Sequence, residues 1–392
     1  MKKILIPSLM GLALVQMLAV SAAAMPAFAR RYSMTCKTCH APFPHLKPYG
    51  EEFAANGFVI ADKETPRYVI DSGDDLLSLL RELPIALRLD GFTSFNNAGT
   101  GRFQFSSPYV LKFLSGGELF KKVSYYFYFF FSEQGEVAGL EDAFLMFNDL
   151  LRTGLDLVVG QFQVSDPLFK RELRLTLEDY QIYGIRPGLS SIDLTYDRGL
   201  MLNAGLRTGT DLTMALVNGS GIGATDEAKN FDSDAYKNLM IRASQNFSKQ
   251  LRVGAFAYLG KERLGDGRNG VWMFGADAAV KSPPFEFNFQ FIERHDNNPL
   301  FFPEDVTDVG IATRGAFAEL IYLPKGDDSR WYGAGLVNWV SSDEPGFERF
   351  SFTAGGGFLL RRNLRLTAEA TYYQQSPYGN HVRLTAGLVT AF

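Results

Sequence analysis

The chain has 392 residues, of which 46% are hydrophobic, and its formal net charge at pH 7 is −4. This balance fits a soluble globular chain as well as a membrane protein, but it lacks the basic surplus that non-specific nucleic-acid binding requires. We therefore expect no nucleic-acid partner. The chain has two cysteines, both within one five-residue stretch, so a disulfide framework is excluded.

The N-terminus has the pattern of a secretory signal peptide. Two lysines precede a long apolar run, and Ala27 and Ala29 supply small residues at the −3 and −1 positions of a cleavage site. A retained transmembrane helix is the alternative, although Pro7 and Gln16 interrupt the apolar run. We assign residues 1–29 to a signal peptide and expect a mature chain outside the cytoplasm.

Residues 30–83 contain the sequence Cys36-Lys37-Thr38-Cys39-His40, which has the C-x-x-C-H pattern of covalent c-type haem attachment. The two thiols form thioethers with the haem vinyl groups, and His40 is carried to the iron as an axial ligand. The motif predicts one haem c, bound by Cys36 and Cys39 and ligated by His40. A redox-active dithiol and half of a zinc site are the alternatives, but the sequence lacks the βαβ context of the first and the further ligands of the second.

The sixth iron position is open. Met34 and His45 are the nearest candidates, but both lie so close to the motif that reaching the opposite haem face is awkward. Met34 packed at the haem edge and His45 exposed in a proline-rich turn are the competing interpretations. We expect His295, in an outer loop, and His381, at a strand end, to be ordinary polar residues of the following domain.

The rest of this segment predicts little regular structure. One short helix is expected from Asp74 to Glu82, where leucines recur at helical spacing. A segment of about 50 residues is too small to build much of a core, so a haem, or docking into the next domain, would have to complete it.

From residue 84 onward, apolar and polar residues alternate in runs separated by turn residues. Phe285 and Phe287, for example, alternate with Glu286 and Asn288. Strict alternation predicts strands with one apolar and one polar face, as in a soluble sandwich or a transmembrane barrel. The charges favour the barrel, because they fall on the face opposite the apolar row, where a wet lumen would receive them. These charged residues are Arg252, Glu286, Arg294, Arg361, Arg365, Glu369 and Arg383.

About sixteen strands are expected, starting near residues 84, 105, 118, 139, 154, 199, 210, 236, 250, 270, 283, 312, 330, 349, 363 and 380. With the C-terminus in the periplasm, short turns such as Gly116-Gly117 fall on the periplasmic side. Long connections, such as Lys261 to Asn269 and residues 164–198, fall on the outer side. The last strand alternates and ends in Phe392, as in outer-membrane barrels. We predict an all-β antiparallel transmembrane barrel over residues 84–392, in the bacterial outer membrane.

Residues 29–58 carry a resemblance to a known family. The run from Ala29 to Thr35 before the cysteines, the run from Pro44 to Phe53 after them, and the barrel resemble the fused monohaem cytochrome–porins of the bacterial outer membrane. This family includes ferrous-iron oxidases. The resemblance implies haem attachment at Cys36 and Cys39, axial ligation by His40, and packing of Tyr49-Gly50 and Phe53 against a haem-bearing plug. Beyond this stretch the agreement is one of architecture.

The resemblance also implies a function. Electrons would pass between an extracellular donor, ferrous iron, and a periplasmic c-type cytochrome or other electron carrier, as in an iron:cytochrome c oxidoreductase. Such a chain needs its redox centre at membrane depth, because the surrounding outer-membrane lipid is an insulator. Two alternatives remain: a porin-type solute channel with the haem segment as its plug, and the same conduit running outward to an extracellular acceptor.

Overall fold

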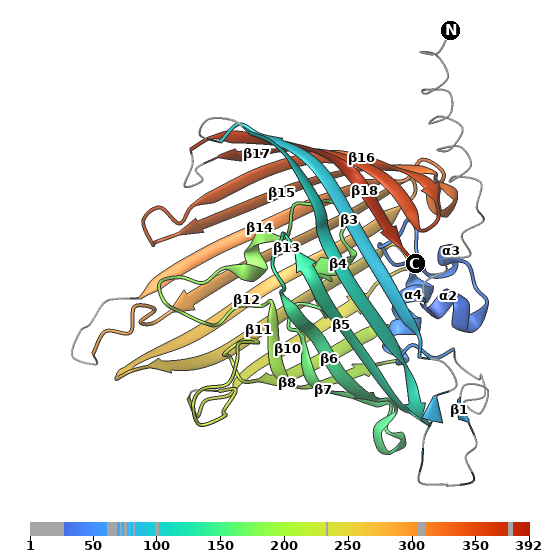
Figure 1. Ribbon diagram of the computed structural model, residues 1–392. Helices are drawn as coiled ribbons and strands as arrows, with labels where there is room; N and C mark the ends of the chain where they lie inside the picture. The colour runs from blue at the N-terminus through green and yellow to red at the C-terminus, as the bar shows by residue number, and fades with distance from the viewer. Residues whose placement is uncertain are drawn as a thin grey trace.

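The structure is a computed structural model that describes residues 27–60, 69–70, 73, 77, 79–80, 83–98, 102–232, 234–303, 310–374 and 379–392. The expected signal peptide therefore lies outside the described residues, except for its last three positions. Sixteen antiparallel strands form one closed barrel, in which β18 pairs with β3 (Figure 1). The strands are β3 Ile85–Asn96, β4 Arg102–Phe120, β5 Val123–Glu133, β6 Gly139–Phe147, β7 Leu155–Gln163, β8 Tyr196–Gly205, β9 Thr210–Val217, β10 Asn238–Asn246, β11 Leu251–Leu264, β12 Gly267–Ser282, β13 Phe285–Asp296, β14 Ile311–Tyr322, β15 Trp331–Ser342, β16 Arg349–Arg361, β17 Leu364–Gln374 and β18 His381–Ala391.

The alternation of the sequence becomes the two surfaces of the barrel wall. On β13, Phe285 and Phe287 are exposed on the outside, whereas Glu286, Asn288 and Gln290 are buried on the inside. An exposed belt of large apolar side chains is stable in lipid, and a closed barrel leaves no strand edge unpaired there. The chain is therefore an integral β-barrel of the outer membrane, and the predicted sixteen-strand fold is confirmed.

The connections differ from the expectation at two hairpins. The predicted turn at Gly116-Gly117 is wrong, because β4 continues to Phe120 and turns at Lys121-Lys122. These glycines serve a close approach instead, since a Cβ on Gly117 would clash with the Arg31 guanidinium of the N-terminal segment. The long outer loop predicted from Lys261 to Asn269 is also wrong. There β11 and β12 stay paired up to Leu264 and Gly267, so only a tight turn remains.

Residues 164–198 were expected as an outer loop, but residues 164–195 fold into the barrel and β8 begins at Tyr196. This inner loop contains the short helices η3 Arg171–Leu173 and η4 Gln181–Gly184. Its apolar side chains, among them the fully buried Tyr183 and Ile192, join the main hydrophobic cluster with inward residues of the wall. The Tyr180 ring stacks on Phe317 with a centroid distance of 4.1 Å. Because these residues bury one another, the loop fills the lumen instead of extending into solvent.

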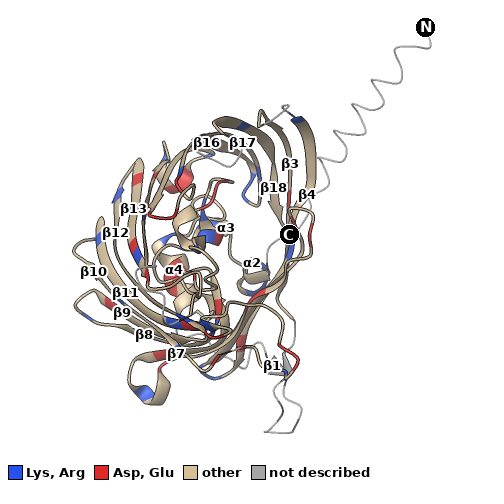
Figure 2. Ribbon diagram, turned by 90° about the vertical axis from the view of Figure 1, so that its left-hand side faces the viewer, with Lys and Arg blue, Asp and Glu red and all other residues tan. Residues whose placement is uncertain are grey.

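The described residues of the N-terminal segment form three short helices, α2 Ala27–Tyr32, α3 Cys36–Cys39 and α4 Pro48–Ala55. They lie beside the C-terminus at the end of the barrel that carries the short turns, within the ring of strands in the turned view (Figures 1 and 2). Short turns mark the periplasmic side of such barrels. None of the helices among the described residues is long and apolar enough to cross a membrane.

Two further sequence expectations need correction. Most of the helix expected from Asp74 to Glu82 lies outside the described residues. Within it, Leu79–Leu80 form the strand β2, which pairs with β1 (Val69–Ile70), so the helix is wrong at these positions. His295 lies within β13 instead of an outer loop, where its ring stacks on Trp272 at 3.9 Å.

Candidate functional site

The cysteine motif forms one helical turn at the periplasmic end of the barrel. Within α3, the backbone N–H of His40 donates to the Cys36 carbonyl oxygen at 2.9 Å, and neither cysteine forms a disulfide. Burial raises the pKa of both thiols. A reactive dithiol depends on a lowered thiol pKa, so this environment disfavours that alternative. The described residues also contain no group of three or more His, Cys, Asp or Glu side chains arranged to hold a metal ion.

His40 has the environment of a neutral metal ligand. Its Nδ1 lies 2.9 Å from the Pro44 carbonyl oxygen, which can only accept, so Nδ1 carries the proton and Nε2 is left unprotonated. Desolvation lowers the pKa of His40 to about 4, so its imidazole is neutral at pH 7. A hydrogen bond that fixes the tautomer and ring orientation is the usual second partner of a metal-bound histidine.

Both cysteines and His40 line a cavity of about 230 Å³ between the N-terminal segment and the barrel wall. The cavity is amphipathic, because its lining is largely apolar and aromatic but also includes Arg88, Lys112 and Glu172. Covalent haem c has the same two-sided chemistry, with an apolar macrocycle and two carboxylates. The residues present therefore fit the group that the motif predicts. The apolar lining comes from the N-terminal segment and from the barrel wall, and it includes Leu46, Phe53, Phe58, Leu114, Tyr126 and Phe144.

Helix α4 packs directly against the motif. Gly50 is buried, and a Cβ at this position would clash with the Cys39 carbonyl oxygen and lie 2.9 Å from Leu46 Cδ2. Phe53 is also buried, with its ring centroid 5.6 Å from that of Tyr32. Gly50 and Phe53 therefore both pack inside the N-terminal segment. Tyr49 does not, because 41% of its surface is exposed.

The structure places the two candidates for the sixth iron ligand in different surroundings. Met34 lines the cavity, together with His40. His45 does not line it, and its Nε2 lies 3.1 Å from Glu286 Oε2 on β13. Burial disfavours the charged form of His45, but the adjacent Glu286 carboxylate outweighs this effect and raises its pKa. His45 thus anchors the segment to the barrel, and Met34 is the candidate that remains at the cavity.

Ion pairs attach the N-terminal segment to the periplasmic end of the wall. Lys37 pairs with Asp328, and Lys47 Nζ lies 2.6 Å from Asp327, both in the turn between β14 and β15. Glu51 of α4 lies 3.8 Å from Lys281 at the end of β12. Aromatic stacking adds to these contacts, since the Phe58 and Tyr126 rings are 4.8 Å apart.

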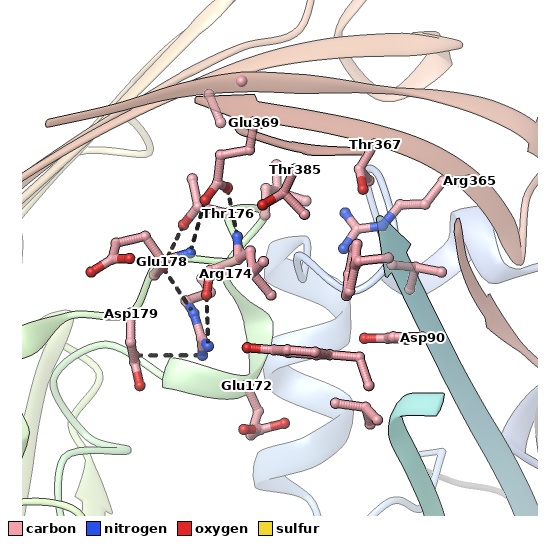
Figure 3. Close-up of a pocket in the computed structure, with 18 of the residues that line it drawn as sticks. Asp90, Glu172, Arg174, Thr176, Glu178, Asp179, Arg365, Thr367, Glu369 and Thr385 are labelled. Atoms are coloured by element: carbon pink, nitrogen blue, oxygen red, sulfur yellow. Dashed lines mark hydrogen bonds and ion pairs between the residues drawn. The ribbon is translucent and has the colours of Figure 1, made fainter. Parts of the chain in front are cut away.

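A second, polar cavity of about 270 Å³ lies between the inner loop and strands β3, β4 and β16–β18 (Figure 3). It shares Arg88, Lys112 and Glu172 with the first cavity, so the two adjoin. The inner loop is bonded across it, for example by the 2.7 Å contact from the Leu177 backbone N–H to Glu369. Sequence patterning identified Arg365, Glu369 and Arg383 as luminal, and each lines this cavity.

Comparisons with protein-family models and with curated proteins give no match. Solved structures do match. An anion-selective porin from Comamonas acidovorans has a TM-score of 0.59 at 10% identity, covering 79% of this chain and 99% of that chain. The outer membrane channel DcaP of Acinetobacter baumannii has a TM-score of 0.55 at 12% identity, covering 79% and 97%. OmpT, an outer membrane protein of Vibrio cholerae, has a TM-score of 0.54 at 9% identity, covering 79% and 99%. The chain thus has the porin-type barrel fold.

Proposed function

We propose that this porin-type barrel of the outer membrane carries one haem c on Cys36, Cys39 and His40 and serves electron transfer between the cell surface and the periplasm. The observation that carries the proposal is the amphipathic cavity that these three residues line, enclosed by the N-terminal segment on one side and the barrel wall on the other. The resemblance to fused monohaem cytochrome–porins supports the same assignment.

When bound, the haem would supply a one-electron iron couple inside a barrel that crosses an insulating membrane. The chain's own residues prepare this site. The two thiols are the attachment points, and the Pro44 carbonyl holds His40 in the tautomer that a metal ligand needs. Phe53, Phe58 and Tyr126 shield the cavity with aromatic surface. Ion pairs to the β14–β15 turn hold the motif in the periplasmic mouth, where a soluble carrier could reach it.

Under this proposal the extracellular donor is ferrous iron, and the periplasmic partner is a c-type cytochrome or another electron carrier. Both come from the family resemblance, and the same conduit could run outward to an extracellular acceptor. A solute channel is the second candidate function. The polar cavity beside the inner loop favours it, as does the fold shared with an anion-selective porin.

The two functions are separated by reconstituting the purified protein in liposomes that enclose a redox dye, with ferrous iron added outside. Electron transfer predicts dye reduction that is lost in His40→Ala and retained in His295→Ala, which removes a histidine remote from the cavity. Solute leakage without dye reduction would contradict electron transfer and favour the channel. A pyridine haemochrome assay on the same samples establishes separately whether haem is attached.

A further inference from the structure

Arg365 on β17 is a buried cation that has no counterion in the described part of the chain. Only 4% of its surface is exposed. Its Nη1 donates to the Tyr332 hydroxyl at 2.8 Å, its Nε has no hydrogen-bond partner, and no described Asp or Glu forms an ion pair with it. It extends from the wall into the polar cavity, beside Thr367 (Figure 3).

The other basic side chains of this cavity are all paired. Arg88 Nη2 lies 2.7 Å from Asp90, and Arg383 Nη2 lies 2.7 Å from Glu178. Each of the remaining ones also has a carboxylate partner; these are Lys112 with Glu172, and Arg171 and Arg174 with Asp179. A guanidinium cannot lose its proton in a protein, and an unpaired buried charge is strongly unfavourable. A carboxylate within hydrogen-bond distance of Arg365 would neutralise its charge.

The position of Arg365 brings it close to the cavity of the cysteine motif. Val389 on β18 pairs with Arg365 on β17 and with Asp90 on β3, so Arg365 and Asp90 lie at the same level of the barrel wall, one strand to each side of β18. Asp90 is the ion-pair partner of Arg88. Arg88 also lines the cavity of the cysteine motif. Its guanidinium carbon lies 6.0 Å from the Phe43 ring centroid, and that ring is 5.4 Å from the His40 ring.

We propose that Arg365, together with Arg88, binds a propionate carboxylate of the haem held by Cys36 and Cys39. The inference rests on the proposed function. The thioether-forming vinyl groups and the propionates lie on opposite edges of haem c, so tethering at α3 directs the carboxylates away from α3. Arginine is the side chain that matches a carboxylate in both geometry and charge. A soluble oxyanion in the lumen offers the same chemistry, and the experiment separates the two sources.

The test compares Arg365→Gln with Arg365→Lys, using Arg361→Gln as the control because Arg361 is exposed at the end of β16. A pyridine haemochrome assay first establishes haem content, and redox titration then gives the midpoint potential. Losing a positive charge beside the propionate favours ferric iron. We expect Arg365→Gln to lower the ferrous-to-ferric ratio at a fixed potential by at least about threefold. Arg365→Lys should retain most of the wild-type value, and Arg361→Gln should retain all of it.

A second measurement asks which anion pairs with Arg365. In the haem-free Cys36→Ala/Cys39→Ala chain, Arg365→Gln should raise the thermal midpoint, because it removes an unpaired buried charge. In the haem-bearing chain it should lower the midpoint. An unchanged potential, or a stability effect of the same sign in both backgrounds, overturns the inference. Added acetate or phosphate that stabilises both backgrounds through Arg365 overturns it too, in favour of a soluble anion. If the haem-free chain does not fold, the redox titration decides.

Wild-type protein without haem would overturn the proposed function and this inference together. That result appears in the haemochrome assay, before any Arg365 variant is compared. If haem is attached but substituting Arg365 changes neither the midpoint potential nor the thermal midpoint, only this inference is overturned.

Discussion

Gly50 of α4 lies against the carbonyl oxygen of Cys39, so that any side chain at position 50 would collide with the cysteine motif. The obstacle is backbone, which cannot move aside as the end of a flexible side chain would. The orientation of the cysteine turn is therefore set by α4, the helix that follows it.

Replacing Gly50 with alanine should displace α3 from α4. Forcing a methyl group into a filled contact costs about 1–3 kcal/mol, so the thermal midpoint should fall and haem content should drop with it. Gly223→Ala is the matched control, since nothing lies within 4 Å of a Cβ at that position. Equal behaviour of the two variants in thermal unfolding and haemochrome assays would contradict the packing role of Gly50.

His45 should make attachment of the N-terminal segment dependent on pH. Its charge state responds to Glu286, Lys281 and Glu319, which face it from the wall. Because its folded-state pKa is raised, its contribution is complete below about pH 6.5 and is lost as the pH rises through the raised value. Thermal midpoints from pH 5.5 to 8.5 should therefore fall in the wild type and fall less in His45→Gln. The haem spectrum should be the same in both, since His45 does not line the cavity; a changed spectrum would make His45 a ligand.

Each ion pair at the β14–β15 turn should contribute little to the stability of the protein on its own. Asp328 and Asp327 are largely exposed, at 68% and 51%, and exposed pairs contribute about 0–1 kcal/mol. Asp327→Asn should therefore leave the thermal midpoint almost unchanged. Charge reversal by Asp327→Lys should weaken the segment's attachment, and adding Lys47→Glu should restore it. Limited proteolysis of the N-terminal segment measures how firmly the segment is attached. If the double variant is cleaved as readily as Asp327→Lys alone, Lys47 and Asp327 do not form a direct pair.

The inner loop should be the main obstacle to solutes. Tyr180 holds it by stacking on Phe317 and by donating to Glu319 at 3.0 Å. Tyr180→Ala removes a buried aromatic ring, at a cost of about 3–5 kcal/mol, and should release part of the loop. Conductance in planar bilayers should rise above that of the wild type, while Tyr236→Ala in an outer loop should not change it. Unaltered conductance in Tyr180→Ala would place the obstacle elsewhere.

The barrel was predictable from sequence because lipid and lumen impose opposite chemistry on alternate residues. Phe285 and Glu286 point to opposite sides for this reason, and β18 shows the same pattern up to Phe392. The Gly116-Gly117 turn was predicted wrongly because a glycine required for close approach looks in sequence like a glycine required for a turn. The inward course of residues 164–195 was missed because the alternation of apolar and polar residues identifies strands but does not indicate which way a loop between them folds.

The site was predictable only in part. Cys36, Cys39 and His40 form a local motif, so their spacing alone indicates the chemistry. Arg88, Lys112 and Glu172 meet the motif only through barrel closure and the inner loop, contacts that no local pattern encodes. Alternation identified Arg365 as luminal, but its lack of a counterion is visible only in three dimensions.

The central claim is that haem is covalently attached at the motif, and peptide mass spectrometry of the exported, purified protein tests it most directly. The peptide that contains Cys36 and Cys39 should carry the mass of one haem, and neither thiol should react with an alkylating reagent after denaturation. A peptide of unmodified mass, with both thiols alkylated in protein made by cells competent for c-type haem attachment, would contradict the claim.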